Sequence, residues 1–292
     1  MPSRRPETRL APHARLPRTY HDRHIAHSTV DAFGRAHWLL TERETDPGGT
    51  QPYDALVVTV EDGTPYETHL GGVLPRCDRV EVLADGGFVL AAARAAPHEE
   101  QIQVFDALGR PSWTFRVGDG IEHLLADEAG DLWVGHFDEG IVGDELSAAG
   151  LRRWSGTGEP LWEYRPVSGS EWFIDCYALN VARRAVWSCP YPRFPLLEIR
   201  DDRVVRVRAN PVRGASGLAV RGERLVFFGG FGDDHDRIVD CRLTEEAVEP
   251  VAESRLVGPD GGALGRRRIV CRGARLYVQV GPCTEWTVLD LG

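Results

Sequence analysis

The chain contains no lysine, and all 34 of its basic residues are arginine. Together with abundant alanine and glycine, this usage is typical of a GC-rich bacterial genome and reflects codons before function. Acidic residues number 44, so the formal net charge is −10. Because nucleic-acid binding requires clustered cations that displace the counterions around phosphates, this balance argues against a nucleic-acid partner.

Long hydrophobic runs are also lacking. No segment approaches the ~18 to 20 apolar residues that a membrane helix needs, and no apolar stretch follows the first arginines. We therefore predict a cytoplasmic protein with no membrane partner. The six cysteines form no CxxC pair, and in a reducing compartment we expect them to be small core residues with free thiols.

A weak internal repeat indicates the fold. Its clearest copy, residues 121–166, reads IEHLLAD, turn EAG, DLWVGHF, a long loop, LRRWSG, turn TGE and PLWEYRP. The copy before it, from RVEVLAD to PSWTFRV, matches in strand order and turn placement. Weaker copies begin near Ser28, Asp175, Ser216 and Arg267. A spacing of roughly 40 to 55 residues is typical of four-stranded propeller blades.

We therefore predict an all-β chain, a six-bladed β-propeller of four-stranded antiparallel blades, with seven blades as the count that the spacing leaves open. The last copy, residues 267–292, has room for three strands only. We expect N-terminal residues near 20–25 to supply the fourth strand and close the ring. Residues 1–18 are rich in Arg and Pro and are predicted to be a flexible segment, with 19–292 forming a single propeller domain.

One segment resembles a known repeat. The sequence GDLWVG at 130–135 is similar to the Gly-Asn/Asp-Leu-Trp-Val/Ile-Gly core of two-component-regulator-type propellers. Together with DCYALNV at 175–181, it resembles an uncharacterised family of stand-alone bacterial propellers over about the middle third of the chain. This resemblance implies the fold and no activity.

Long, charged loops are expected to gather at one end of the ring, where binding and catalysis usually take place. Two acidic groups belong to them: Asp138 with Glu139, and the stretch GFGDDHDR with Asp233 and His235. Carboxylates and an imidazole at a propeller mouth could bind a divalent cation, which would resemble gluconolactonase-type propellers. The alternative is that they are solvated, or paired with arginines such as Arg237.

Polar and aromatic residues also surround the start of the fourth copy. Asp175 and Tyr177 begin an innermost strand, where they could act as acid and base, or Asp175 could accept neighbouring backbone N–H groups. Trp172 is expected to stack on a ligand or to anchor its loop, and Cys176 would need a cation such as Arg193 for activation. The histidines at 123 and 136 are expected to be packed core residues.

Two functions remain open. The first is a ligand- or protein-binding propeller that uses the loop-rich, acidic end, because no specific catalytic motif such as G-x-S-x-G occurs. The alternative is a metal-assisted hydrolase, lyase or isomerase, whose cofactor is unspecified beyond a divalent metal. The expected partners are a small molecule or a protein. The catalytic candidates are Asp138, Glu139, Asp175 and Tyr177, and the ligand-binding candidates are Trp172, Arg193, Asp233 and His235.

Overall fold

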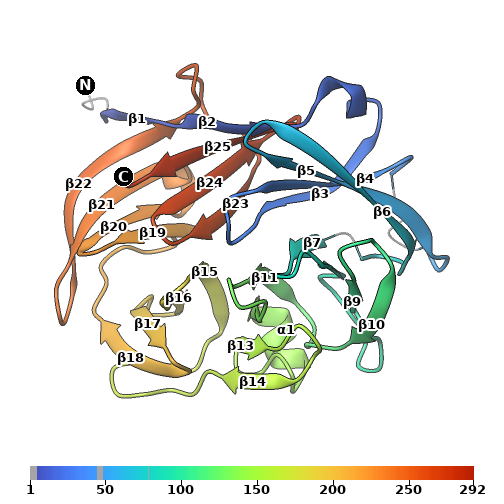
Figure 1. The fold of residues 1–292 in the computed structure, drawn as a ribbon. Coiled ribbons are helices and arrows are strands. Elements are labelled where there is room, and N and C mark those ends of the chain that lie inside the picture. The colour runs from blue at the N-terminus through green and yellow to red at the C-terminus, as the bar shows by residue number, and fades with distance from the viewer. Residues whose placement is uncertain (1–4, 45–48, 78) are drawn as a thin grey trace. The chain divides into compact units, whose positions relative to one another are not determined.

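The computed structural model describes residues 5–44, 49–77 and 79–292. Within these residues 25 strands form six sheets (Figure 1). Five sheets have four strands, and the sixth has four antiparallel strands with one further strand at its edge. These sheets are the four-stranded antiparallel blades of a six-bladed β-propeller, which confirms the predicted fold class. All six predicted repeat copies coincide with a sheet.

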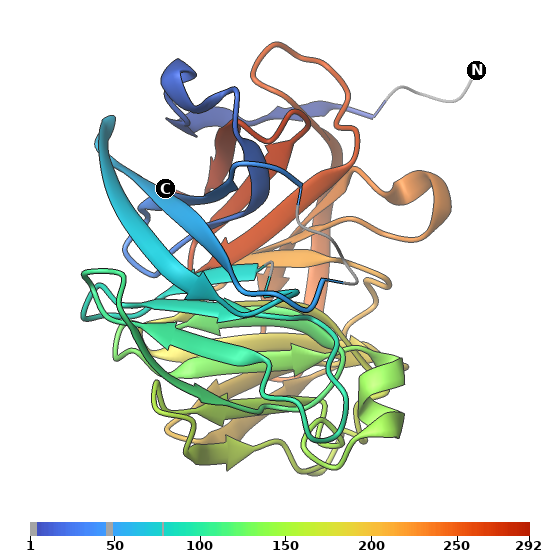
Figure 2. The ribbon, with the colours of Figure 1, turned by 90° about the vertical axis from the view of Figure 1, so that its right-hand side faces the viewer.

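Three of the sheets belong to a compact unit of residues Ala14–Arg165. Their strands are β3 (His24–Val30), β4 (Ala36–Thr41), β5 (Tyr53–Glu61) and β6 (Thr64–Val73); β7 (Arg79–Val82), β8 (Phe88–Ala91), β9 (Ile102–Phe105) and β10 (Pro111–Phe115); and β11 (Ile121–Ala126), β12 (Leu132–His136), β13 (Leu151–Trp154) and β14 (Pro160–Glu163). The 3₁₀ helix η1 (Arg18–Tyr20) precedes them. A short helix, α1 (Asp138–Gly143), lies between β12 and β13 (Figure 2). No helix of the described residues is long and apolar enough to cross a membrane.

The other three sheets belong to a second compact unit, Pro166–Gly292 together with the N-terminal residues up to His13. Their strands are β15 (Asp175–Ala182), β16 (Ala185–Tyr191), β17 (Leu196–Arg200) and β18 (Arg203–Arg208); β19 (Gly217–Arg221), β20 (Arg224–Phe228), β21 (Arg237–Leu243) and β22 (Val248–Val257); and β23 (Arg267–Arg272), β24 (Arg275–Val280) and β25 (Glu285–Asp290). The 3₁₀ helix η2 (Gly232–Asp234) lies between β20 and β21.

Two N-terminal strands complete these sheets. β2 (Ala11–Arg15) lies beside β25 as the fourth strand, and β1 (Glu7–Arg9) pairs in parallel with β22 as a fifth strand. The predicted closure by an N-terminal strand is thus confirmed, but its predicted location at residues 20–25 is wrong, because Tyr20 ends η1 and Ile25 belongs to β3. Both strands also lie inside the segment predicted to be flexible, of which residues 1–4 are outside the described residues.

The tight turns share a side-chain cap. Four tight turns each begin with a capping residue: Asp31, Asp106, Asp127 or Ser155. Its side chain accepts the backbone N–H groups of the residues two and four positions later, for example Phe33 and Arg35. The residue three positions after the cap is a glycine in each turn, with φ between 77° and 91°. A three-residue hairpin loop needs this left-handed position, which explains why a glycine recurs at the same place in these turns.

Apolar side chains fill the space between neighbouring sheets of one unit. In the Ala14–Arg165 unit, Val89 and Ile102 of one sheet pack with Leu132 and Trp154 of the next. In the Pro166–Gly292 unit, a cluster around Trp187 and Phe227 has the same composition of buried aliphatic and aromatic residues. Alternate residues of each strand thus point into these layers, as the repeat predicts.

One buried amide joins three sheets of the Pro166–Gly292 unit. Asn180 lies on β15, and its Nδ2 donates to the carbonyl oxygens of Leu218 at 2.8 Å and Gly273 at 2.9 Å. Its Oδ1 accepts from the backbone nitrogen of Gly273 at 2.8 Å. Leu218 belongs to β19 and Gly273 to the turn between β23 and β24, so one fully buried side chain satisfies backbone groups of two further sheets.

Candidate functional site

The loop-rich end of the Pro166–Gly292 unit carries a cluster of aromatic rings. β15 begins there with Asp175 and β16 ends there with Tyr191, and the strand register pairs these two residues. The loop between β20 and β21 reaches the same place, because the ring centroid of Phe231 lies 6.0 Å from that of Tyr177. Residues far apart in the sequence therefore meet at this end.

Tyr177 occupies the centre of this cluster. Its ring contacts Phe194 edge-on, with centroids 5.0 Å apart, and stacks on Tyr191 at 6.0 Å and 27°. Phe194 also contacts Tyr191 and Phe231 at 5.7 and 6.0 Å. The Arg213 guanidinium lies 5.7 Å from the Phe194 centroid, within cation–π distance. Edge-on and offset pairs of this kind hold aromatic rings in fixed orientations.

Phe194 anchors the loop between β16 and β17. Its φ is +56°, a left-handed conformation that costs a bulky residue about 1–3 kcal/mol. The conformation is held by burial of the ring, by the Phe194 N–H donated to Pro190 O at 2.9 Å, and by Asn210 Nδ2, which donates to Phe194 O at 3.0 Å. Tyr191 is therefore presented on a rigid loop.

Three rings of this region face solvent. Trp172 is 58% exposed, Phe231 55% and Tyr191 38%. Trp172 and Tyr191 line one shallow groove together with Arg193, and the groove has a volume of only about 20 Å³. We call Trp172, Tyr191 and Phe231, with Tyr177 and Phe194 beneath them, the aromatic surface.

The other predicted residues of this end take simpler positions. Asp175 is half-buried at the start of β15, and Tyr177 packs within the aromatic cluster. Arg193 is exposed and pairs with Glu171 at 3.0 Å. Their predicted catalytic or binding roles stay predictions, but Trp172 is clearly not a buried loop anchor.

Arginines neutralise much of the acidic stretch before β21. Asp234 pairs with Arg5 at 2.7 Å and Arg237 at 3.3 Å, which hold the pKa of the Asp234 carboxyl below its usual range. Asp233 is exposed on η2. His235 is exposed too, and its Nδ1 donates to Gly232 O at 3.3 Å. This stretch is thus organised by ion pairs and by its own backbone.

The other predicted acidic pair lies in the Ala14–Arg165 unit. Asp138 and Glu139 are exposed in the first turn of α1, and Asp138 Oδ1 accepts the Glu139 N–H at 2.8 Å. The Glu139 carboxylate pairs with Arg94, which also binds Asp119 at 3.0 Å. Across residues 5–44, 49–77 and 79–292, no three His, Cys, Asp or Glu side chains are arranged to hold a metal ion.

His136 is a buried core residue, as predicted. Its Nδ1 donates to Asp119 O at 2.8 Å, and its Nε2 has no hydrogen-bond partner among the described residues. The pKa of His136 is lowered to about 4. Burial is the main cause and the charge of Arg152 contributes, while the hydrogen bond to Asp119 opposes the shift. The ring is therefore neutral at pH 7.

This lowered pKa predicts a pH-dependent stability. An unfolded histidine titrates near pH 6.5, so the unfolded state binds the proton first and the native state loses stability as the pH falls from about 6.5 toward 4. We expect this residue to account for a loss of about 1.5 kcal/mol in the free energy of unfolding between pH 6.5 and 5. Urea denaturation of the wild type and His136→Gln at both pH values measures it, and equal pH slopes for the two proteins would contradict it.

The cysteines behave as core residues. Five are buried and Cys283 is half-buried, and none of the six forms a disulfide. Burial raises the pKa of the Cys189, Cys241 and Cys271 thiols to about 12, so these three stay protonated at neutral pH. Cys176 is fully buried, which disfavours the activated thiol considered from the sequence.

Sequence reasoning missed three members of the aromatic surface: Tyr191, Phe194 and Phe231. Each lies at or just after the end of the second strand of a sheet. An aromatic residue inside a long polar loop was the available signal, but its meeting with Tyr177 depends on how β15, β16 and β20 lie in space.

No family model and no curated protein matches the chain. Solved structures resemble it in fold. A chain of the mitotic checkpoint complex gives a TM-score of 0.54 at 11% identity, covering 92% of this chain and 76% of that chain. Hsv2 of Kluyveromyces lactis gives 0.52 at 10%, covering 92% and 74%. The β-propeller domain of Cps50 (Swd1) of Myceliophteria thermophila gives 0.51 at 11%, covering 92% and 84%. These likenesses show the β-propeller fold alone.

Proposed function

We propose that this chain is a protein-binding β-propeller and that the aromatic surface is its contact site. The observation that carries this proposal is the exposure of Tyr191 and Phe231 above packed rings, with the exposed Trp172 lining the same groove as Tyr191. Trp and Tyr, with Arg, are the residue types that dominate binding energy at protein interfaces, especially when held rigidly. Exposed aromatic rings on a rigid loop meet this description.

The ion pairs around the aromatic surface indicate that a partner would bind the rings and not the acidic side chains. Arg193 is paired with Glu171, and Asp234 is paired with Arg5 and Arg237. These groups already have partners within the chain, so the rings are the surface that a partner would cover. We accordingly refine the predicted acidic binding end to an aromatic centre with a charged, paired rim.

A macromolecular partner suits this surface better than a metabolite. Small-molecule sites usually have ~300–1,000 Å³ of enclosed space. The groove beside Trp172 and Tyr191 has about 20 Å³, enough for the tip of one partner side chain. One solved structure with the same fold is described as part of a complex, which agrees with a protein partner. A cytoplasmic location remains a prediction from the sequence.

Site-specific crosslinking tests this proposal. We expect a photoreactive phenylalanine analogue at Phe231, expressed in cells of the source organism, to crosslink one discrete protein. The same analogue at Tyr66 should not, although Tyr66 is also 55% exposed. With that partner purified, Trp172→Ala and Phe231→Ala should each weaken binding at least about tenfold, as removal of a central aromatic contact does.

The matched control is Tyr66→Ala, which removes an equally exposed ring from β6 and should leave the affinity unchanged. A partner that binds the Trp172 and Phe231 variants as tightly as the wild type would disprove the proposal. So would equal crosslinking from both positions, because this would indicate nonspecific capture.

A further inference from the structure

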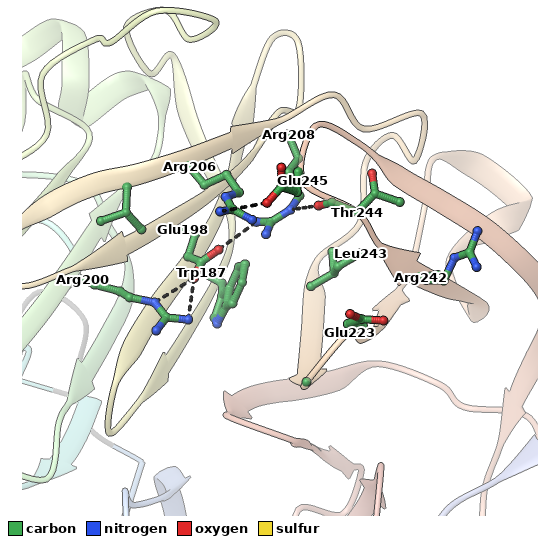
Figure 3. A pocket seen from close by; sticks show the side chains of 12 residues that line it. Trp187, Glu198, Arg200, Arg206, Arg208, Glu223, Arg242, Leu243, Thr244 and Glu245 are labelled. Carbon is green, nitrogen blue, oxygen red and sulfur yellow. Dashed lines mark hydrogen bonds and ion pairs between the residues drawn. The ribbon is translucent and has the colours of Figure 1, made fainter.

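A second pocket in the Pro166–Gly292 unit is lined by arginines (Figure 3). It lies between the outer strands β17 and β18 of one sheet and the turns 222–223 and 244–247 of the next, with a volume of about 700 Å³. Phe231 precedes β21 and Thr244 follows it, so the length of a strand separates this pocket from the aromatic surface. The charged side chains that line it are Arg200, Arg206, Arg208, Arg242, Glu198, Glu223 and Glu245.

Glu198 forms the buried base of this pocket. Its Oε1 accepts from Arg200 Nε at 2.7 Å and its Oε2 from Arg208 Nη1 at 2.9 Å. One carboxylate therefore lies between two guanidinium groups, and the trio retains one positive charge. The Glu198 and Arg208 side chains are almost fully buried, whereas the Arg200 side chain is 49% exposed, so the excess positive charge is accessible to solvent.

Arg208 is held in a fixed orientation. Besides Glu198, its Nε donates to Thr244 O at 2.6 Å, and its guanidinium lies 5.6 Å from the ring centroid of Trp187. The side chain is almost fully buried, yet it lines the pocket. A planar guanidinium fixed by several contacts is preorganised to bind an oxyanion, because little rotational freedom remains to be lost.

Arg206 is the adaptable member. It lies two residues before Arg208 on β18, and Figure 3 shows both guanidinium groups at the same side of the pocket. Its ion-pair partner Glu245 is 4.0 Å away, with 89% of the side chain exposed. This long, solvated contact is weak. An oxyanion of a ligand that bound Arg206 more tightly could therefore replace the Glu245 carboxylate.

We infer that this pocket binds a small molecule with two or more oxyanion groups, carboxylate or phosphate. Arg206 and Arg208 would bind one group, and Glu245 would be displaced from Arg206. Arginine is suited to both groups, because its fork of N–H donors matches their paired oxygens. The volume lies within the ~300–1,000 Å³ typical of small-molecule sites.

Calorimetric titration with citrate and with pyrophosphate tests the inference, using acetate and chloride at matched ionic strength as monovalent probes. We expect at least one polyanion to bind with Kd below about 1 mM, and the comparison of citrate with pyrophosphate distinguishes carboxylate from phosphate as the source of the oxyanion. Arg206→Gln should weaken binding at least about tenfold, whereas Glu245→Gln should tighten it about threefold or more, because it removes the competing carboxylate. Both side chains are exposed enough for the variants to fold.

The matched control is Arg275→Gln, which removes another exposed arginine from an ion pair, with Asp290 at 2.8 Å. It should leave the Kd unchanged, as should Phe231→Ala, so the outcome is independent of the aromatic surface. The inference is overturned if neither polyanion binds with a Kd below about 1 mM, if Arg275→Gln weakens binding as much as Arg206→Gln, or if Glu245→Gln does not tighten it.

Discussion

Replacement of Asn180 by alanine is expected to lower the free energy of unfolding by about 4 kcal/mol. The variant leaves Leu218 O without its side-chain donor and removes both side-chain bonds to Gly273, all in a fully buried position. Each buried polar group without a partner costs about 1–3 kcal/mol. Because these bonds join three sheets of the Pro166–Gly292 unit, their loss should reduce the urea midpoint for the whole unit.

The isosteric Asn180→Asp variant separates hydrogen bonding from packing. It keeps the volume and the acceptor toward Gly273 N, but replaces the donor Nδ2 with a carboxylate oxygen that faces two carbonyl oxygens. We expect it to be at least as destabilising as alanine at pH 7. A midpoint within error of the wild type for either variant would show that the amide does not link the sheets.

Asp31→Ala should lower the free energy of unfolding by about 3 kcal/mol, because the hydrogen-bond donors around this buried carboxylate would lose their charged acceptor. The Asp31 carboxylate accepts from the backbone nitrogens of Phe33 and Arg35, from Arg35 Nε at 2.7 Å and from His37 Nε2 at 3.0 Å. Burial raises the pKa of Asp31, but the bond and charge of His37 and the charge of Arg35 outweigh it and lower the pKa to about 2.

The sign of this shift predicts a pH window. Since the native pKa lies below the unfolded value of 3.8, the unfolded state binds the proton first. The stabilisation is complete above pH 4 and is lost as the pH falls toward 2. Chemical denaturation at pH 7 and pH 3 measures it. Asp106→Ala is the matched control, because Asp106 caps an equivalent turn with a side chain that is 33% exposed, against 1% for Asp31, and its loss should matter much less. Equal effects of the two substitutions would contradict the argument.

The six blades could be predicted because their signals are local. Each turn cap, such as Asp31 or Asp127, lies a fixed distance before its glycine, and each hairpin buries alternate apolar residues. The closing strand could not be located this way. All five residues of β2 are exposed or half-buried, so no alternation of apolar and polar side chains marks it.

The candidate site was predictable only in part, since long-range arrangement decides it. Charge alone distinguishes Glu139 and the stretch around Asp233 in the sequence, but their surroundings depend on distant arginines: Arg94 pairs with Glu139, and Arg5 with the neighbouring Asp234. The aromatic surface requires three strand ends and a loop to meet. The pocket around Arg208 likewise joins strands and turns separated by tens of residues. Periodicity and local motifs in a single sequence do not show which distant segments will be in contact.

The N-terminal strands also set an order of events during synthesis. The Thr8 and Ser254 hydroxyls, 246 positions apart, share a hydrogen bond of 2.6 Å across β1 and β22. At ~5–20 residues per second, a ribosome needs roughly 10 to 50 s to make the intervening chain, so β1 waits that long for its partner. Nascent blades must therefore survive for that time with an open edge, whose unpaired backbone N–H and C=O groups can pair with other chains.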